Sequence, residues 1–493
     1  MINKILGERH MVRDEFYWLG QMNKATIIAN SAGALLTPQL ARTAALALKE
    51  VIESGKDPAN RVKRVIDFEP KLIAAAGTSE VTEIHVGRSS QDMHSTFRAA
   101  IMRDEVINVS RALENVIDKL LDLARAHQDT VMPSYTNGVA AQPTTFAHYL
   151  LGFIEGFKRD RVRLTQFYSR LNFCPMGSCV LNGTGWPLNR KLMAKLLGFR
   201  APSRNAFDAT QIAMVDLPIE FAQIQASIAL HISEMIADIM VQYAQPRPWI
   251  LLSEGNGNTY VSSAMPQKRN PGLLISCRGN ASDVVSEANL AVIRAHNVPS
   301  GMIDGKSVKV HSALADLSVK TMERFVKILS ALVVNKERAL EELSLDWTAS
   351  QEIADRLMSE YKLPFRVGHH VASAMVGYAR ANGILPLTFP YEEMKRIYAE
   401  TVSKEMPGFS TDCPMSEEEF RASLNPREII ARRRTEGSAN PEEVSRMLAE
   451  LTSEMAILKE DTAMKAAHID QSMADLDSQF QPFTEDMIEE KED

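Results

Sequence analysis

The chain has 493 residues, of which 45% are hydrophobic and 24% are charged, so it can bury sizeable cores in more than one domain. A net charge of -7 argues against nucleic acid or an anionic membrane surface as a partner. The four scattered cysteines complete no metal-ligand pattern. The cysteine pattern therefore predicts no metal site. Neither a secretion signal nor an apolar run of about 18–20 residues is recognised, so we expect a cytoplasmic protein.

The first segment whose residues could take part in binding or catalysis is EIHVGRSSQDMHST, residues 83–96. After His85 it groups the polar residues Arg88, Ser89, Ser90, Gln91 and Asp92. A cation beside several short hydrogen-bonding groups suits a dicarboxylate, because charge-assisted bonds hold and orient such a ligand. The alternative is a helix N-terminus with a capping serine and a surface arginine.

The second segment is MPSYTNGVAAQPTTFAH, residues 132–148. Pro143 predicts the first turn of a long helix, because a proline there loses no helical hydrogen bond. Thr136, Asn137 and Gln142 are therefore expected just before a helix N-terminus, where free N–H groups favour an anion. An ordinary turn is the alternative.

Helical periodicity dominates the middle of the chain. Apolar residues recur at three- and four-residue steps in four segments, which span 143–171, 218–243, about 275–297 and about 310–342. Such lengths exceed the usual mean of about 11–12 residues and predict a bundle, with apolar faces wide enough to pack on other subunits. Strand-like alternation is scarce. We expect an all-α protein with domains at 1–112, 113–362 and 363–493, the last ending in an acidic tail.

The third segment is YVSSAMPQKRNPG, residues 260–272. Its side chains of interest are Ser262, Ser263, Met265, Lys268 and Asn270. A serine hydroxyl is a poor base unless its alkoxide is stabilised, and the ammonium of Lys268 can do so in a partly desolvated site. The preceding EGNGN would let the loop close and exclude water. The alternative is a solvated loop in which serine serves turn formation.

The three segments together resemble the fumarase/aspartase superfamily, whose Ser-Ser-x-Met-Pro-x-Lys-x-Asn-Pro loop matches residues 262–271. Within it, HVGRSS, YTNGVAAQP, NFCPMGSCVLNGTGWP and LPFRVGHH make the chain most similar to argininosuccinate lyase. The clear resemblance covers about residues 75–310, and weaker matches continue to about 450.

The resemblance implies a three-domain helical fold around a central long-helix bundle, in a homotetramer whose active sites each take loops from three subunits. It also implies elimination across a succinyl unit, with release of fumarate and no organic cofactor. By the match, Ser262 is the base, Lys268 stabilises its alkoxide, and His85 is a histidine shared by several members. The implied substrate-binding residues are Arg88, Ser89, Ser90, Gln91, Thr136, Asn137, Gln142, Ser263, Met265 and Asn270.

Several positions depart from the pattern of argininosuccinate lyases. Asn137 stands where many members have a histidine that acts as or supports the general acid, and Ser90 and Gln91 replace an Arg-Asn pair. Val261 replaces a glycine. The positions that align with the residues of argininosuccinate lyases on the guanidino side of the substrate are Met302, Ser307 and Val310. We therefore expect a carbon–nitrogen lyase for another N-substituted aspartate, working in either direction.

Three alternatives stay open. The chain could be a genuine argininosuccinate lyase, or a non-catalytic structural paralogue in which Asn137 marks decay. The SSQD stretch, residues 89–92, also resembles carboxymuconate-type cycloisomerases. The intact Ser262 loop argues against decay.

Overall fold

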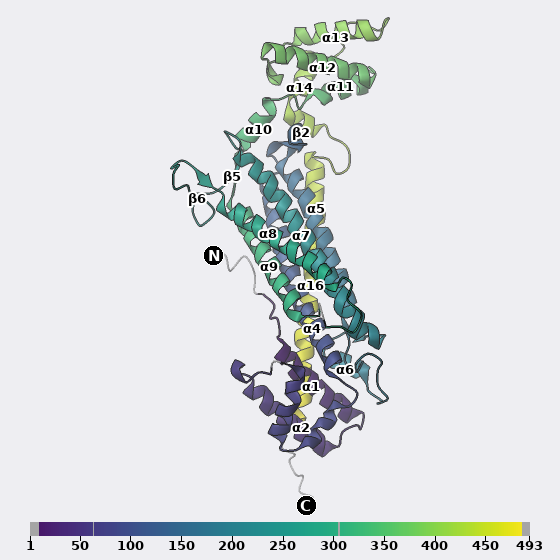
Figure 1. The fold of residues 1–493 in the computed structure, drawn as a ribbon. Coiled ribbons are helices and arrows are strands. Elements are labelled where there is room, and N and C mark those ends of the chain that lie inside the picture. Colours follow the sequence, from purple (N-terminus) through teal and green to yellow (C-terminus); the bar gives the residue numbers. More distant parts are fainter. Residues whose placement is uncertain (1–8, 63, 304–305, 486–493) are drawn as a thin grey trace, which may run out of the picture.

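The computed structural model describes residues 9–62, 64–303 and 306–485, and helices make up most of it (Figure 1). A bundle of long helices forms an elongated body, with a smaller group of helices at each end (Figure 1). The described strands form only two-stranded pairs. The predicted all-α fold is confirmed, while residues 486–493 of the expected acidic tail lie outside the described residues.

The N-terminal end is a group of short helices around α1. Its elements are α1 (Glu15–Ala32), α2 (Pro38–Ser54), η2 (Pro58–Asn60), η3 (Val65–Asp67), α3 (Phe68–Ala76) and η4 (Ser79–His85). The carboxylate of Asp14 accepts a hydrogen bond from the N–H of Tyr17 and starts α1, and Thr37 caps α2 ahead of Pro38. The last of these elements, η4, includes the start of the first polar segment at residues 83–85.

The central bundle contains the longest helices. They are α4 (Ser90–Ala126), α5 (Phe146–Leu171), α7 (Ala213–Tyr243), α8 (Gly272–Ala295), α9 (Val308–Ala331) and α16 (Pro441–Phe480). Apolar side chains at helical spacing are buried along α5, at Phe146, Leu150, Ile154 and Phe157. The last helix, α16, returns beside α4, α1 and α5. The boundaries near 112 and 362 remain predictions, and α4 continues through residue 112.

The helix expected from Pro143 begins later. Pro143 lies in a hairpin of β1 (Val131–Thr136) and β2 (Val139–Thr145), and α5 starts only at Phe146. The hairpin forms because Asn137 and Gly138 adopt positive φ angles of 53° and 78°, as a tight two-residue turn requires. The Asn-Gly pair therefore outweighs the helix signal of the proline.

The segment expected as one helix over 310–342 is also divided. After α9 the chain forms β8 (Leu332–Val334), which pairs antiparallel with β5 (Ile250–Leu252), and then α10 (Lys336–Ser344). A consecutive Leu-Val-Val run favours a strand once a partner strand is available. This pairing ties the stretch that leads into the third segment to the end of α9.

One helical stretch contradicts the expectation that no apolar run is long enough to span a bilayer. Asp208–Tyr243, which is α7 with a π-helical start (Asp208–Ile212), is long and apolar enough to cross a membrane by length and composition. The expectation that no segment would qualify is therefore wrong by that measure. Half of its most apolar window is buried in the protein, where α7 packs against α8, α5 and α9. The buried apolar residues there serve helix packing in the bundle.

The other end of the body has its own core. Its helices are α11 (Ser350–Ser359), α12 (Phe365–Asn382), η6 (Pro386–Thr388), α13 (Tyr391–Glu405), α14 (Glu417–Leu424) and α15 (Pro426–Ala431). Trp347, Phe389 and Phe420 lie in this core, and the ring of Phe389 contacts both others edge-on. Shorter elements elsewhere are β3 (Phe173–Cys174), β4 (Ala201–Pro202), α6 (Arg190–Leu196), β6 (Tyr260–Val261), β7 (Arg269–Asn270) and η7 (Gln481–Phe483).

Candidate active site

The first polar segment forms the N-terminus of α4. The Ser89 hydroxyl accepts a hydrogen bond from the N–H of Gln91 at 3.0 Å, and Asp92 Oδ1 accepts one from the N–H of Ser89 at 2.8 Å. This reciprocal capping box satisfies two N–H groups that a helix end otherwise leaves free. The structure thus shows Ser89 in the capping role that the alternative interpretation gave it. Gln91 uses its side-chain N–H on the carbonyl of Thr210, at 3.2 Å.

Arg88 is buried, so the surface arginine of that alternative is wrong. Its side chain donates to the hydroxyl of Thr26 at 3.3 Å, and its Nε is buried without a partner. Burial lowers the pKa of Arg88 to about 10, although the neighbouring carboxylates of Asp92 and Glu69 oppose the shift. Arg88 and Ser90 line a cavity of about 330 Å³. A buried cation with an unused N–H group at a cavity is suited to an oxyanion.

His85 lines the same cavity and remains half-exposed. Its Nδ1 lies 3.3 Å from Glu69 Oε2. Burial lowers the pKa of His85, the nearby Arg88 lowers it further, and Glu69 opposes both. The direction of this shift favours the neutral ring, which can accept a proton.

Asp92 is a positioning residue to which the sequence interpretation assigned no role. Its Oδ2 accepts hydrogen bonds from the N–H groups of Gly177 and Cys179, at 2.9 and 3.2 Å. Burial raises the pKa of Asp92 to about 6, against the effect of its backbone hydrogen bonds. One carboxylate therefore joins the start of α4 to the loop after β3. The Ser89-x-x-Asp92 spacing is a sequence signal for the capping box.

The second polar segment lies at the tip of the β1–β2 hairpin. Thr136 and Asn137 are exposed there, ahead of β2 and nine or more residues before α5 begins at Phe146. The expected position beside a helix N-terminus is therefore wrong for both, because Thr145 rather than this turn caps α5. Gln142 donates its amide to Gln351 Oε1 of α11 at 2.6 Å.

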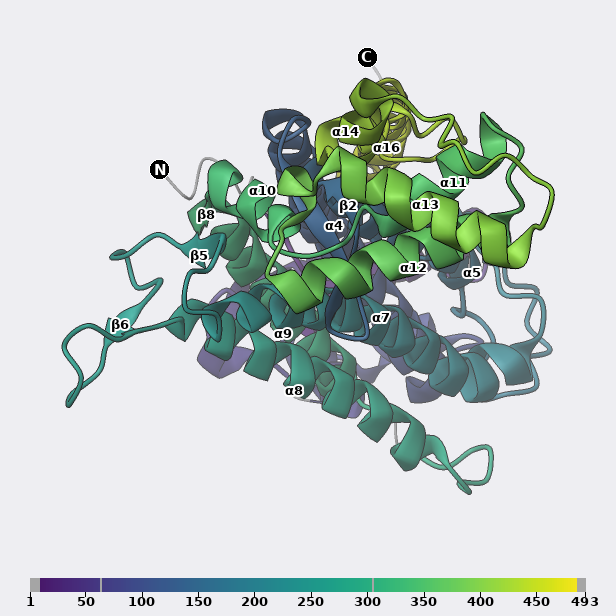
Figure 2. The same ribbon diagram turned by 90° about the horizontal axis from the view of Figure 1, so that it is seen from above.

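The third segment projects from the bundle as a loop carrying the short β6–β7 pair, and two perpendicular views show it extending outward (Figures 1 and 2). The Ser262 hydroxyl accepts from the N–H groups of Ala264 and Met265, at 3.3 and 3.2 Å, and so orders the turn. Lys268 is exposed, and within the described residues no hydrogen bond joins its ammonium to that hydroxyl. Asn270 donates to the carbonyl of Tyr260 at 3.4 Å. Ser263 and Met265 are exposed on the same loop.

One chain does not bring the three segments together. The first lies at the N-terminus of α4 and the second follows its C-terminus, and a 37-residue helix is roughly 55 Å long. The loop that carries β6 projects away from the helices of the bundle (Figure 2). Each segment has suitable side chains, but no pair of segments forms a closed site within the described residues.

Comparisons with known proteins place this arrangement among lyases. A family model described as lyase matches residues 10–286, and one described as argininosuccinate lyase C-terminal matches residues 347–431. The argininosuccinate lyase of Methanoculleus marisnigri is 31% identical over 388 residues, which are 78% of this chain and 75% of that protein. The argininosuccinate lyase of Methanothermobacter thermautotrophicus is 29% identical over 413 residues, or 83% and 86% of the two chains.

Solved structures share the fold at lower identity. EDDS lyase in complex with formate superimposes with a TM-score of 0.84 at 22% identity, over 95% of this chain and 92% of that one. The 3-carboxy-cis,cis-muconate lactonizing enzyme from Pseudomonas putida gives a TM-score of 0.63 at 16% identity, over 93% and 97%. At these identities the likeness concerns the fold alone.

Proposed function

Because the chain belongs to the lyase family of the fumarase/aspartase superfamily and is a carbon–nitrogen lyase similar to argininosuccinate lyases, we propose the following reaction for it. It cleaves or forms the C–N bond of an N-substituted aspartate, and fumarate is the unsaturated product. The observation that carries this proposal is the complete Ser-Ser-x-Met-Pro-x-Lys-x-Asn-Pro loop at residues 262–271, held on an outward-projecting turn.

The proposed chemistry begins at Ser262. Its alkoxide takes a proton from the carbon adjacent to the C–N carbon, and the electron pair moves onto the neighbouring carboxylate. The resulting aci-carboxylate carries extra negative charge, which pre-placed donors such as Lys268, Asn270 and Arg88 can stabilise. The pair then returns to form the carbon–carbon double bond as the C–N bond breaks. The departing nitrogen takes a proton from a group other than Asn137, because an amide is not acidic near neutral pH.

The separation of the loops supports a shared active site. Since α4 holds the Arg88 and Thr136 segments roughly 55 Å apart, a site containing both needs another copy of the chain. The bundle also leaves apolar side chains exposed along α7 and α8, namely Leu230, Val241, Ile275, Val292 and Ile293. Such a surface suits association between copies. We therefore retain the homotetramer with sites built from three subunits as part of the proposal.

The substrate we propose is not argininosuccinate. The positions aligned with its guanidino contacts carry Met302, Ser307 and Val310, and two of these side chains are apolar. A guanidinium needs hydrogen-bond acceptors or a carboxylate, which Met302 and Val310 lack. A different amine half is expected, with a dicarboxylate half held by the motif residues.

An NMR screen tests the proposal. The protein is mixed with fumarate and a panel of amines and amino acids, including arginine and diamines, and new N-substituted aspartates are sought. Ser262→Ala should abolish product formation. Ser282→Ala should not, because it removes an exposed hydroxyl that, among the described residues, bonds the carbonyl of Arg278 within α8. A product that persists in Ser262→Ala would remove this serine from the base role.

The same screen separates the alternatives. Product from arginine alone would identify a genuine argininosuccinate lyase. No product with any amine, together with no binding of fumarate, would indicate a non-catalytic paralogue. Absence of amine products together with lactone formation from a carboxymuconate would instead indicate a cycloisomerase.

A further inference from the structure

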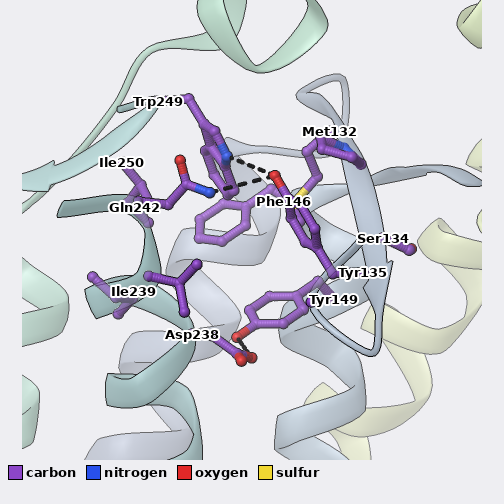
Figure 3. A pocket seen from close by; sticks show the side chains of 13 residues that line it. Met132, Ser134, Tyr135, Phe146, Tyr149, Asp238, Ile239, Gln242, Trp249 and Ile250 are labelled. Carbon is purple, nitrogen blue, oxygen red and sulfur yellow. Dashed lines mark hydrogen bonds between the residues drawn. The ribbon is translucent and has the colours of Figure 1, made fainter. Parts of the chain in front are cut away.

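A second cavity lies under the β1–β2 hairpin, whose residues belong to the second polar segment. It has a volume of about 360 Å³ and is enclosed by the hairpin, the start of α5, the end of α7 and β5 (Figure 3). Its walls include the aromatic rings of Tyr135, Phe146, Tyr149 and Trp249. Neither Thr136 nor Asn137 lines it. The volume suits a small organic molecule.

The aromatic rings form one continuous wall. Phe146 stacks on Tyr149 with ring centroids 5.9 Å apart and planes 13° from parallel. Trp249 meets Phe146 edge-on at 6.0 Å. The faces of such rings carry partial negative charge and attract a cation, most strongly where water is excluded.

Asp238 supplies a full negative charge at the edge of the cavity. The hydroxyl of Tyr149 donates a hydrogen bond to Asp238 Oδ2 at 2.7 Å, which aligns the carboxylate beside the aromatic wall (Figure 3). Burial raises the pKa of Tyr149 well above 10, and Asp238 and Glu234 raise it further, so this hydroxyl remains a donor. None of the described lining residues is basic, so no cation of the protein occupies the place opposite Asp238.

Gln242 leaves a polar atom unused in the same wall. The hydroxyl of Tyr135 accepts hydrogen bonds from Gln242 Nε2 at 3.3 Å and from Trp249 Nε1 at 3.4 Å (Figure 3). Gln242 Oε1 is buried and has no partner. Rotating the amide would leave the NH₂ group without a partner instead, so one hydrogen-bonding atom stays unsatisfied in either orientation.

We propose that this cavity binds a small organic cation, specifically a primary ammonium carried by an aromatic or apolar body. The body would fill the space against Phe146 and Trp249, and the ammonium would lie between the ring faces and the carboxylate of Asp238. An anion would meet Asp238 with like charge, and a neutral molecule would gain only the apolar contact. This site is separate from the motif residues of the proposed lyase reaction, so its test does not depend on turnover.

Isothermal titration of the full-length protein with benzylammonium tests the assignment. Benzyl alcohol and phenylacetate serve as neutral and anionic probes of similar shape. We expect saturable binding of one benzylammonium per chain, and at least about tenfold weaker binding of the other two probes, because the cation–π and ionic contacts are absent.

Asp238→Asn should weaken benzylammonium binding about tenfold, since it removes the charge but keeps the shape. Asp283→Asn, which neutralises an exposed carboxylate on α8 outside the cavity, is the matched control and should bind like the native protein. Tyr149→Phe keeps the ring and releases Asp238, so a smaller loss is expected. Circular dichroism verifies that each variant is folded.

Three results would overturn the proposal. One is the absence of saturable benzylammonium binding at about 10 mM, a concentration at which even weak small-molecule sites fill. Another is equal affinity for benzyl alcohol or phenylacetate. The last is unchanged benzylammonium affinity in folded Asp238→Asn.

Discussion

Replacing Arg161 by methionine probes the contact that holds α16 in the bundle. The Arg161 side chain is 1% exposed, and its Nε donates to Glu114 Oε1 of α4 at 2.8 Å. Its Nη2 donates to the carbonyl of Leu458 in α16 at 2.7 Å and also to the hydroxyl of Thr462. Thr462 in turn donates to the same oxygen of Glu114. The substitution would leave the Glu114 carboxylate buried without its cation.

The expected loss follows from that burial. Removing one partner of a buried ion pair typically costs about 3–5 kcal/mol, because the remaining charge keeps its desolvation penalty. The pair of Arg170 and Glu220 has the same chemistry, but its side chains are 50% and 34% exposed. Arg170→Met should therefore cost less than about 1 kcal/mol. Urea unfolding of both variants gives the two free energies of unfolding directly.

A double variant isolates the charge. Adding Glu114→Gln to Arg161→Met removes the uncompensated carboxylate and keeps an oxygen that can accept from Thr462. We expect this second change to recover about 1–3 kcal/mol, the usual cost of a polar group left unsatisfied. The reasoning would be refuted if Arg161→Met cost no more than Arg170→Met, or if the double variant were as unstable as Arg161→Met alone.

Two further predictions concern the candidate site. Burial raises the pKa of Asp92 from 3.8 to about 6, so the folded protein binds this proton more tightly than the unfolded chain, and stability falls as pH rises from about 4 to about 6. A shift of about two pKa units corresponds to about 3 kcal/mol of stability, most of which is lost between pH 4 and 7. Urea unfolding at these two pH values should show a larger loss of unfolding free energy in the native protein than in Asp92→Asn. Equal losses in the two proteins would contradict the prediction. Asn137→His, on the exposed hairpin tip, should add an ionisation near pH 6.5 to the pH dependence of kcat, measured on the product of the amine screen. A profile identical to that of the native protein would exclude position 137 from proton transfer.

Much of the fold could be predicted because its long helices have regular apolar spacing. The errors occur where a local preference depends on a partner. Pro143 is compatible with both a helix start and a strand, and the Asn137-Gly138 turn decided for the strand. The return of α16 to α4 could not be predicted, because periodicity shows which face of a helix is apolar but not which helix covers it.

The motif residues were easier to identify than their roles. Ser89 caps α4, as the alternative interpretation had it, whereas Arg88 is buried and not the surface arginine of that alternative. Nothing in the residue types distinguishes a capping serine from a ligand-binding one, since both use the same hydroxyl. The serine base, the substrate, the tetramer and the cytoplasmic location stay predictions.

The distance between the first two motif segments follows from the length of α4, which the sequence analysis did not predict as one helix. A helix that starts at Ser90 and lasts to Ala126 must separate its two ends by roughly 55 Å, whatever its surroundings, because each residue adds about 1.5 Å. A buried arginine at one end and an exposed threonine at the other therefore cannot hold the same small dicarboxylate within one chain. If both bind substrate, the rigid α4 makes association between copies a condition of activity and not only of stability. The exposed apolar side chains of α7 and α8 are the surface on which we propose that this association takes place.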